Sequence, residues 1–528
     1  MKLTDRIQYI SASTTDLIHI VVPSDTSQDP AGSSYKIPLQ FILDLVTLPT
    51  FTNYWVTGST GTYSLKEIND SGLDATGNYS LAQNYATLAQ GMYSHAEGYY
   101  NTSKGRASHA EGGYGAGLGN PNLASGDSSH AEGQLTTAGG TASHSEGNQT
   151  ISVGQYSHAE GNQTIASGVY SHTEGYQTLA SGASSHAEGQ LTISSGTSSH
   201  AEGESTIAGG NYSHAEGQNT RASGQRSHAE GLASIASGDS SHAEGWITRA
   251  FGNYSHAEGL GTTASGAASH AEGRSTIAIG QDSHAEGQNT RASGLSSHAE
   301  GLASTASGQS SHAEGQQTLA SADFSHTEGQ QTTASGTSSH AEGENTKAFG
   351  QRSHAEGFNT TASGTASHAE GYLTSAGGEG SHAEGGIPSL LIAGGKAIGV
   401  ASHAAGTSTL AIGEASHAEG SGTIARGDIS HAEGTATTAL GDYSHSGGQN
   451  STASGNTSFV HGSNSIAGGT NTIVFGANII GTANNTTYVD RLNIKTLPIA
   501  DTEAAAITAE LATGTVYRTT TGELRIKL

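Results

Sequence analysis

The chain has 528 residues, a formal net charge of −26 and only 33% hydrophobic residues. This composition cannot supply the large apolar cores that several globular domains of this total length would need. With 20 Lys and Arg and no Cys, the chain lacks the clustered positive charge of a nucleic-acid-binding protein and the thiols of disulfides or thiolate metal sites. We expect no nucleic-acid partner.

The N-terminal residues 1–50 are expected to form a small attachment module. Its start, Met1–Ser11, lacks the apolar core of a secretory signal, and no run in the chain approaches the roughly 18 apolar residues of a membrane span. We expect synthesis in the cytoplasm and no membrane insertion. Thr15–Pro23 is typical of a strand, and Tyr35–Leu45 is predicted to form a short amphipathic helix after a loop.

Residues 51–79 are expected to form a cap or transition, and residues 80–480 a repeat array. A Ser-His-Ala-Glu-Gly motif recurs every 14 residues from His130 to His382. Internal repetition at a fixed period predicts a stack of identical turns. Each unit has two halves of the form small-x-Ala-x-Gly, such as Ser213–Gly217 and Thr220–Gly224. Alternation at period two predicts two short strands per turn, and each glycine predicts a bend with a demanding backbone conformation.

The same alternation assigns an inside and an outside to each turn. Ser213 and Ala215 point one way, and His214 and Glu216 point the other. Small residues suit an interior where two sheets approach closely. The His and Glu positions stay nearly constant along the array, whereas the outward positions of the second strand vary. We therefore predict that the constant positions lie between protomers, with each Glu accepting from a His or Ser on its own or a neighbouring chain.

The predicted ladder between protomers is represented by His95, Glu97, His109, Glu111, His130, Glu132, His214, Glu216, His298, Glu300, His382, Glu384, His431 and Glu433. A dication at every level of a stack with ~4.8 Å spacing would repel its neighbours, although occasional ions or ordered water are an alternative. A catalytic site is one irregular constellation and not a motif copied along a rod. We predict no catalytic residues, no metal site and no cofactor, and hence a protein that is not an enzyme.

Two intervals between motif histidines, His109–His130 and His382–His403, are seven residues longer than the rest. We place the extra residues at Gly113–Gly119 and Gly386–Ile392. If the first were an ordinary strand, every later motif would move to the opposite sheet until the second moved it back, but the glycines and Pro388 favour surface excursions, which are natural places for binding. Tyrosines precede the motif at several turns, among them Tyr156, where packing at the rim is preferred over carbohydrate stacking.

Residues 481–528 are expected to form a C-terminal neck or tip. Tyr488–Ile494 is typical of a strand, Glu503–Ala512 of a short helix, and Thr515–Arg518 with Glu523–Lys527 of a hairpin. By analogy with fibres this tip is distal and contacts a receptor.

The half-repeats Thr220–Arg226 and Ser458–Gly462 resemble the head repeat of trimeric autotransporter adhesins of the YadA type. The resemblance implies an all-β, left-handed parallel β-roll solenoid with 14 residues per turn, and three rolls about one axis as a parallel homotrimer. The ends differ from those adhesins and look like those of tail fibres of bacteriophages or contractile phage-like particles.

We therefore expect a structural and adhesive tail fibre that binds a baseplate or tail protein through residues 1–50 and a host cell-surface receptor or glycan elsewhere. Its location would be the virion or an extracellular phage-like particle. The alternatives are a bacterial cell-surface trimeric adhesin and a tailspike acting on surface polysaccharide. The tailspike fits less well, because this roll is narrow and uniform.

Overall fold

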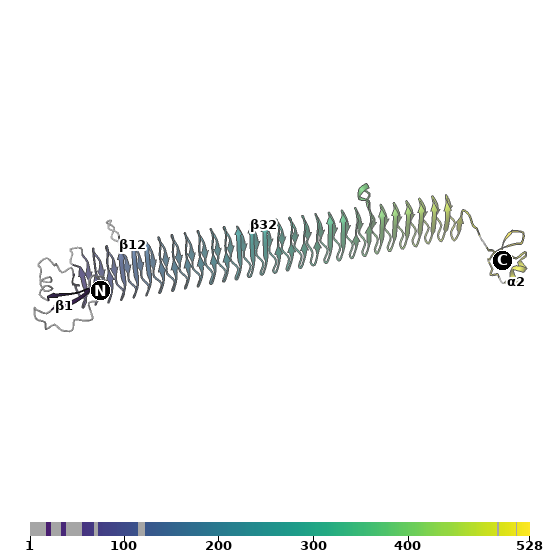
Figure 1. Ribbon diagram of the computed structural model, residues 1–528. Coiled ribbons are helices and arrows are strands. Elements are labelled where there is room, and N and C mark those ends of the chain that lie inside the picture. The colour runs from purple at the N-terminus through teal and green to yellow at the C-terminus, as the bar shows by residue number, and fades with distance from the viewer. Residues whose placement is uncertain are drawn as a thin grey trace. The chain divides into compact units, whose positions relative to one another are not determined.

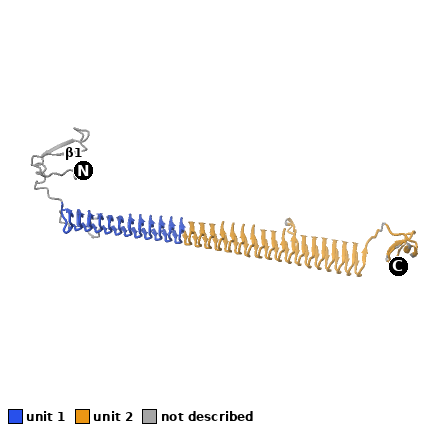
Figure 2. Ribbon diagram, turned by 90° about the horizontal axis from the view of Figure 1, so that it is seen from below, with its two compact units in different colours: residues 1–233 blue, residues 234–528 orange. Residues whose placement is uncertain are grey.

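The computed structural model describes residues 17–22, 33–38, 55–67, 72–113, 122–493, 496–509, 511–513 and 515–527. The chain divides into two compact units, Met1–Ala233 and Ser234–Leu528, which Figure 2 shows in different colours. The described residues form an all-β parallel solenoid of about 29 turns with about 14 residues per turn, as the repeat predicts.

Near the N-terminus, β1 (Leu17–Val22) and β2 (Ser33–Pro38) form an antiparallel pair, labelled at β1 in Figure 1. The strand predicted at Thr15–Pro23 is confirmed over Leu17–Val22. The helix predicted over Tyr35–Leu45 is wrong at its start, because Tyr35–Pro38 belong to β2, where Tyr35 is opposite Ile20. A partner strand outweighs the weak helical pattern there. Residues 39–50 lie outside the described residues.

The solenoid of the first unit begins with β3 (Trp55–Thr57) and β4 (Leu65–Glu67), which pair antiparallel. Every later pairing in the solenoid is parallel, and strands alternate between two sheets. The motif strands, from β8 (His95–Ala96) onward, lie in one sheet with His above His. The strands of the second half-repeat, such as β25 (Arg221–Ala222), lie in the other. We call these the motif sheet and the second sheet.

The interior between the two sheets consists of small side chains, as predicted. Ser213, Ala215, Thr220 and Ala222 are all buried. The Ser213 hydroxyl donates to the Gly210 carbonyl over 2.7 Å, and the same bond recurs in most turns. An Ala and Ser interior buries little apolar area, so backbone pairing supplies much of the order within a turn.

Glycine is needed at the bends for two different reasons, and the sequence predicted only the first, a left-handed backbone conformation. Gly217 has φ +99°, in the region that favours glycine, as predicted. Gly210, at the end of a second half-repeat, is not left-handed; it is required because a Cβ there would lie 1.9 Å from the Gly224 carbonyl oxygen. Most other left-handed residues of the described chain precede an inward Ser or Thr, such as Asn219 and Arg226, both at φ +57°.

Both long intervals keep the motif on its sheet. His109 in β10 (His109–Gly112) pairs with His130 in β12 (His130–Gln134). Likewise His382 in β48 (His382–Glu384) pairs with His403 in β50 (His403–Thr407). A surface excursion is therefore confirmed for the second interval, and in the first interval the motif likewise stays on its sheet.

The excursion of the second unit comprises residues 387–393 and projects from the solenoid in Figure 1. It contains the 3-10 helix η1 (Pro388–Leu390). The N–H of Gly386 donates to the Gly406 carbonyl, as the residue after a motif glycine does in a regular turn. The N–H of Gly394 donates to the Tyr372 carbonyl over 2.9 Å. One turn earlier, Leu373 makes the equivalent bond to the Phe358 carbonyl. Seven residues are thus inserted between two ordinary rim positions. Residues 114–121 of the first excursion lie outside the described residues.

The motif sheet ends with β60 (Ile473–Ala477) and β62 (Thr487–Val489), which pair in successive turns, so the strand expected at Tyr488–Ile494 is shorter and belongs to the motif sheet. Beyond it, α2 (Glu503–Thr508) begins at Thr502, whose hydroxyl accepts from the Ala505 N–H.

The expected hairpin is confirmed as β63 (Val516–Arg518) and β64 (Leu524–Ile526). Tyr517 of β63 is buried against Ala500 and Ala506. Within the described ranges, no helix has the length and apolarity needed to cross a membrane.

Candidate functional site

The outward side chains of the motif sheet form one continuous surface in each unit, which we call the His–Glu face. Within a strand the His and Glu are two residues apart, so both point away from the buried Ala between them. Because the strands pair parallel and in register, each His lies above the His of the previous turn and each Glu above a Glu.

The imidazole rings of the His–Glu face form stacked columns. From His95 to His228 in the first unit, neighbouring ring centroids are 4.6–4.9 Å apart and the planes differ by 12° at most. Burial lowers the pKa of His186, and the neighbouring His172 and His200 lower it further. A neutral ring is favoured since a charged one would be desolvated beside other imidazoles.

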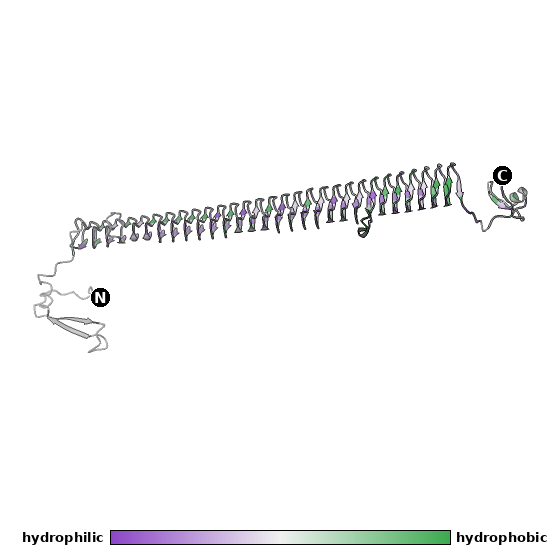
Figure 3. Ribbon diagram, turned by 90° about the horizontal axis from the view of Figure 1, so that it is seen from above, coloured by the Kyte–Doolittle hydropathy of each residue, from purple (hydrophilic) through white to green (hydrophobic). Residues whose placement is uncertain are grey.

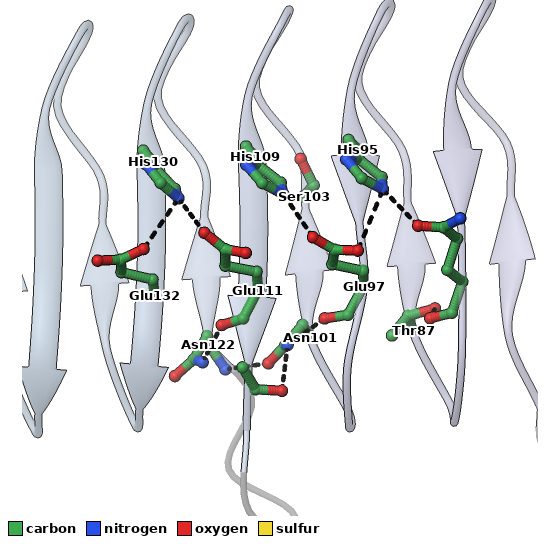
Figure 4. Close-up of polar contacts among 12 residues, drawn as sticks. Thr87, His95, Glu97, Asn101, Ser103, His109, Glu111, Asn122, His130 and Glu132 are labelled. Carbon is green, nitrogen blue, oxygen red and sulfur yellow. Dashed lines mark hydrogen bonds and ion pairs between the residues drawn. The ribbon is translucent and has the colours of Figure 1, made fainter. Parts of the chain in front are cut away.

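Each imidazole lies between two carboxylates from successive turns. The Nε2 atom of His130 is 3.0 Å from an oxygen of Glu111 and 3.7 Å from an oxygen of Glu132, as Figure 4 shows. His109 similarly lies 3.4 Å from Glu97. Most other pairs are 3.3–4.0 Å apart, so the contacts are mainly electrostatic, and hydrogen bonds form at only a few turns.

The glutamates form a second column and share protons along it. Hydrogen bonds from Glu174 and Glu202 raise the pKa of Glu188 to about 8, and the same contacts hold the pKa of Glu174 and Glu202 below the ordinary value. Two adjacent carboxylates cannot both ionise cheaply, so one keeps the proton and donates it to the other. Similar alternation raises the pKa of Glu132, Glu160 and Glu216 to about 7.

A groove runs beside this glutamate column. In the first unit it has a volume of about 1270 Å³ and is lined by the Glu and Gly residues of successive motifs from Glu111 to Gly231. The floor is glycine because a Cβ at Gly203 would lie 2.1 Å from the Gly217 carbonyl oxygen. The imidazoles and carboxylates therefore project from the face, and a groove with a glycine floor runs beside them.

All predicted ladder residues lie on the His–Glu face. Those of the first unit are His95, Glu97, His109, Glu111, His130, Glu132, His214 and Glu216, and those of the second are His298, Glu300, His382, Glu384, His431 and Glu433. In a single chain about one third of each side chain stays exposed, 37% for His214. The placement of this face between protomers stays a prediction.

Sequence reasoning missed that the face becomes apolar at both ends. In the first unit, Leu65 and Leu81 occupy the His position before His95. In the second unit, Phe459, Ile473 and Phe475 occupy His or Glu positions, and Phe475 is 47% exposed. Figure 3 colours these last strands as hydrophobic. The register of the repeat, extended outward from the motif strands, could have identified them.

The outward side chains of the second sheet differ from turn to turn, as predicted. Ile207, Arg221 and Ile235 follow one another in the first unit and the start of the second. At the rim, Tyr156 and Tyr170 are more than half exposed and stack with centroids 5.0 Å apart. At these two turns the rim tyrosines therefore pack on each other.

A comparison with protein families finds the YadA head domain repeat at residues 187–213, 215–241, 271–297, 299–321, 328–353, 404–428 and 446–472. All these segments lie in the solenoid, and each spans about two turns. No curated protein matches the chain. The solenoid therefore contains YadA head repeats, and over these segments the chain is similar to a β-roll of that kind.

Proposed function

We propose that the chain is a structural and adhesive fibre protein, without enzymatic activity, that assembles as a parallel homotrimer through its His–Glu face. The observation that carries this proposal is the apolar character of that face at its ends. Phe459 and Ile473 lie on it in the second unit beside the exposed Phe475. Exposed aromatic and aliphatic side chains at interface-like positions favour a protein partner.

The uniformity of the face favours an identical chain as that partner. Each turn presents the same imidazole and carboxylate at the same height, so only a partner with the same period can match every turn in register. Three chains are proposed because the YadA head repeats suggest a trimeric adhesin-like fibre.

The finer proposal is a tail fibre of a bacteriophage or contractile phage-like particle. Residues 1–50 would bind a baseplate or tail protein, and the rims, the excursions and the C-terminal residues 496–527 would contact a receptor or glycan on the host surface. The variable second sheet and the exposed rim tyrosines support a binding role for the outer surface. Its location would be the particle, outside the producing cell.

A bacterial cell-surface adhesin is the second candidate, favoured by the YadA head repeats themselves. Mass spectrometry of particles purified by density gradient from producing cells separates the two. We expect the chain to co-purify with tail proteins in a fixed ratio. Its absence from particles, together with labelling on intact cells, would refute the tail-fibre proposal and support the adhesin. Cleavage of surface polysaccharide by the purified protein would refute both in favour of a tailspike.

A further inference from the structure

The His–Glu face of the second unit contains one irregular cluster near its end. It lies on β54 (His431–Thr435), β56 (His445–Gln449) and β58 (Phe459–Ser463). Gly447 stands where the motif has Glu, and His461 stands at the same position one turn later. The last glutamate of the column, Glu433, therefore faces a glycine and then an imidazole.

The ring of His445 leaves the regular stack. Its centroid is 4.8 Å from that of His431, but its plane is turned by 79°, and it packs instead against Phe459 at 4.7 Å. In this orientation its Nε2 atom is 3.3 Å from Oε1 of Glu433. The Nε2 atom is buried and forms no hydrogen bond within the described residues.

His461 reaches back across Gly447 to the same carboxylate. Its Nδ1 atom lies 3.7 Å from Oε1 of Glu433. A Cβ at Gly447 would be 2.5 Å from this Nδ1 and 3.0 Å from the Oε1 atom, so the missing side chain creates the space that the imidazole uses. The His461 side chain is 55% exposed and borders a groove of about 550 Å³, which gives solvent access.

The distances fit one small cation. Zinc binds His nitrogen and carboxylate oxygen at roughly 2.0–2.2 Å with tetrahedral geometry, which places two ligand atoms of the same ion about 3.3 Å apart. His445 and His461 both approach that spacing from the single oxygen of Glu433. Two imidazoles and one carboxylate that leave a position open form a common ligand set for zinc.

The regular ladder does not offer the same geometry. Two nitrogens bound to one zinc ion can be at most about 4.2 Å apart. The parallel rings of His340 and His354 have centroids 4.8 Å apart, which exceeds that limit. Regular turns also bring two imidazoles and one carboxylate within 4.8 Å of one another, but the Glu contacts them through different oxygens, as Glu342 does with His340 and His354. At the irregular cluster the single Oε1 of Glu433 lies near both imidazoles.

We propose that Glu433, His445 and His461 form a binding site for one divalent transition-metal ion of the zinc class, with Oε1, Nε2 and Nδ1 as ligands and a fourth position open to water. The site lies within one chain and does not depend on the trimer or on the particle. The ion would tie three successive turns together where the glutamate column ends.

The test uses the full chain, with Co²⁺ as a spectroscopic probe for zinc. We expect the visible absorption of tetrahedral Co²⁺, a tight class of about one ion per chain, and displacement of the bands by Zn²⁺. His461→Ala should weaken this class by roughly tenfold or more. Gly447→Ala, whose Cβ would occupy the space that the His461 ring uses, should do the same without removing or adding a ligand.

His340→Ala removes one imidazole from the regular ladder of the same unit and should leave the tight class unchanged. Thermal unfolding of each variant without metal verifies folding. Equal affinity and stoichiometry in the wild type and in His461→Ala would overturn the proposal. So would many equivalent ions per chain that weaken alike in His340→Ala and His461→Ala.

Discussion

Gly210 packs directly against the backbone of Gly224 on the next turn, so closely that a Cβ atom at residue 210 would lie 1.9 Å from the Gly224 carbonyl oxygen. The neighbouring Gly209 has no atom nearer than 3.8 Å to its would-be Cβ. There is thus no space for a side chain at Gly210, whereas there is space at the adjacent Gly209. Neither is left-handed, so any effect of substitution reports space and not backbone conformation.

Gly210→Ala should destabilise the first unit by about 1–3 kcal/mol, because the turns must separate to admit the methyl group. Gly209→Ala should be neutral or slightly stabilising, since it only restricts the unfolded chain. Hydrogen exchange read by mass spectrometry over residues 196–226, with thermal unfolding, measures both. Equal protection in the two variants would contradict the steric explanation.

The interior hydroxyls of one repeat should respond oppositely to removal. Ser213→Ala deletes the 2.7 Å bond to the Gly210 carbonyl and should cost about 1 kcal/mol. The Thr220 hydroxyl is buried and finds no partner among the described residues, so Thr220→Val, which keeps the shape, should be neutral or stabilising. Chemical denaturation measures the change in the free energy of unfolding of each variant. A loss of similar size in both would show that the Thr220 hydroxyl has a hydrogen-bond partner.

Stability should be greatest near pH 6.5 and should fall as the pH rises from there to about 8. The pKa of His186 lies below 6.5 in the folded chain, so the unfolded chain binds more protons as pH falls through 6.5, and folding weakens. The pKa of Glu188 is raised from 4.5 to about 8, so its contribution is complete below 4.5 and is lost as pH rises through 8. Melting temperatures measured from pH 5 to pH 9 should give a maximum, and association should weaken in mild acid.

A set of substitutions separates the carboxyl contribution to the pH dependence of stability from the imidazole contribution. Changing Glu132, Glu160, Glu188 and Glu216 together to Gln keeps an amide donor where the protonated carboxyls lie and removes the groups with raised pKa. The loss of stability between about pH 6.5 and pH 8 should shrink, whereas the weakening in acid should remain because the imidazoles are intact. An unchanged loss over that range would refute the assignment to shared carboxyl protons.

The proposed interface has a matched pair of phenylalanines in the second unit. Phe475 lies on the His–Glu face and is 47% exposed, and Phe349 lies beside the second sheet and is 46% exposed. Phe475→Asp should shift the homotrimer toward monomer in sedimentation equilibrium, because a charge would be buried between chains. Phe349→Asp should leave the mass unchanged. The reverse result would place the interface on the second sheet.

The excursion of the second unit should be removable. Deleting residues 387–393 joins Gly386 to Gly394, which already make the hydrogen bonds of ordinary rim residues, so the melting temperature should change little. Deleting seven regular residues, Gln316–Ala322, should be strongly destabilising, since later motifs would move to the opposite sheet. Equal losses would mean that the excursion supports the stack. A fall in cell binding with the first deletion alone would assign the exposed Leu390 and Leu391 to recognition.

Much of the fold followed from the sequence because period two and period 14 leave few arrangements. The small interior and the parallel turns could be predicted from residues such as Ser213 and Ala215, and the second excursion from the long interval between His382 and His403. The left-handed residues could not, because Arg226 and Asn219 carry no compositional signal and are set by the bend itself. The cluster at His461 also escaped prediction, since it depends on a ring rotation at His445 and on the space above Gly447.

The left-handed residue before each motif serine accepts tyrosine, serine, alanine or arginine, as at Tyr212, Ser198, Ala142 and Arg226. A position that imposes a shape on the backbone but none on the side chain can vary without disturbing the turns beneath it. The rim can therefore diversify one turn at a time, while the alanine interior and the imidazole column keep their spacing. Variable rim positions and constant interior positions thus occupy separate places in the same repeat.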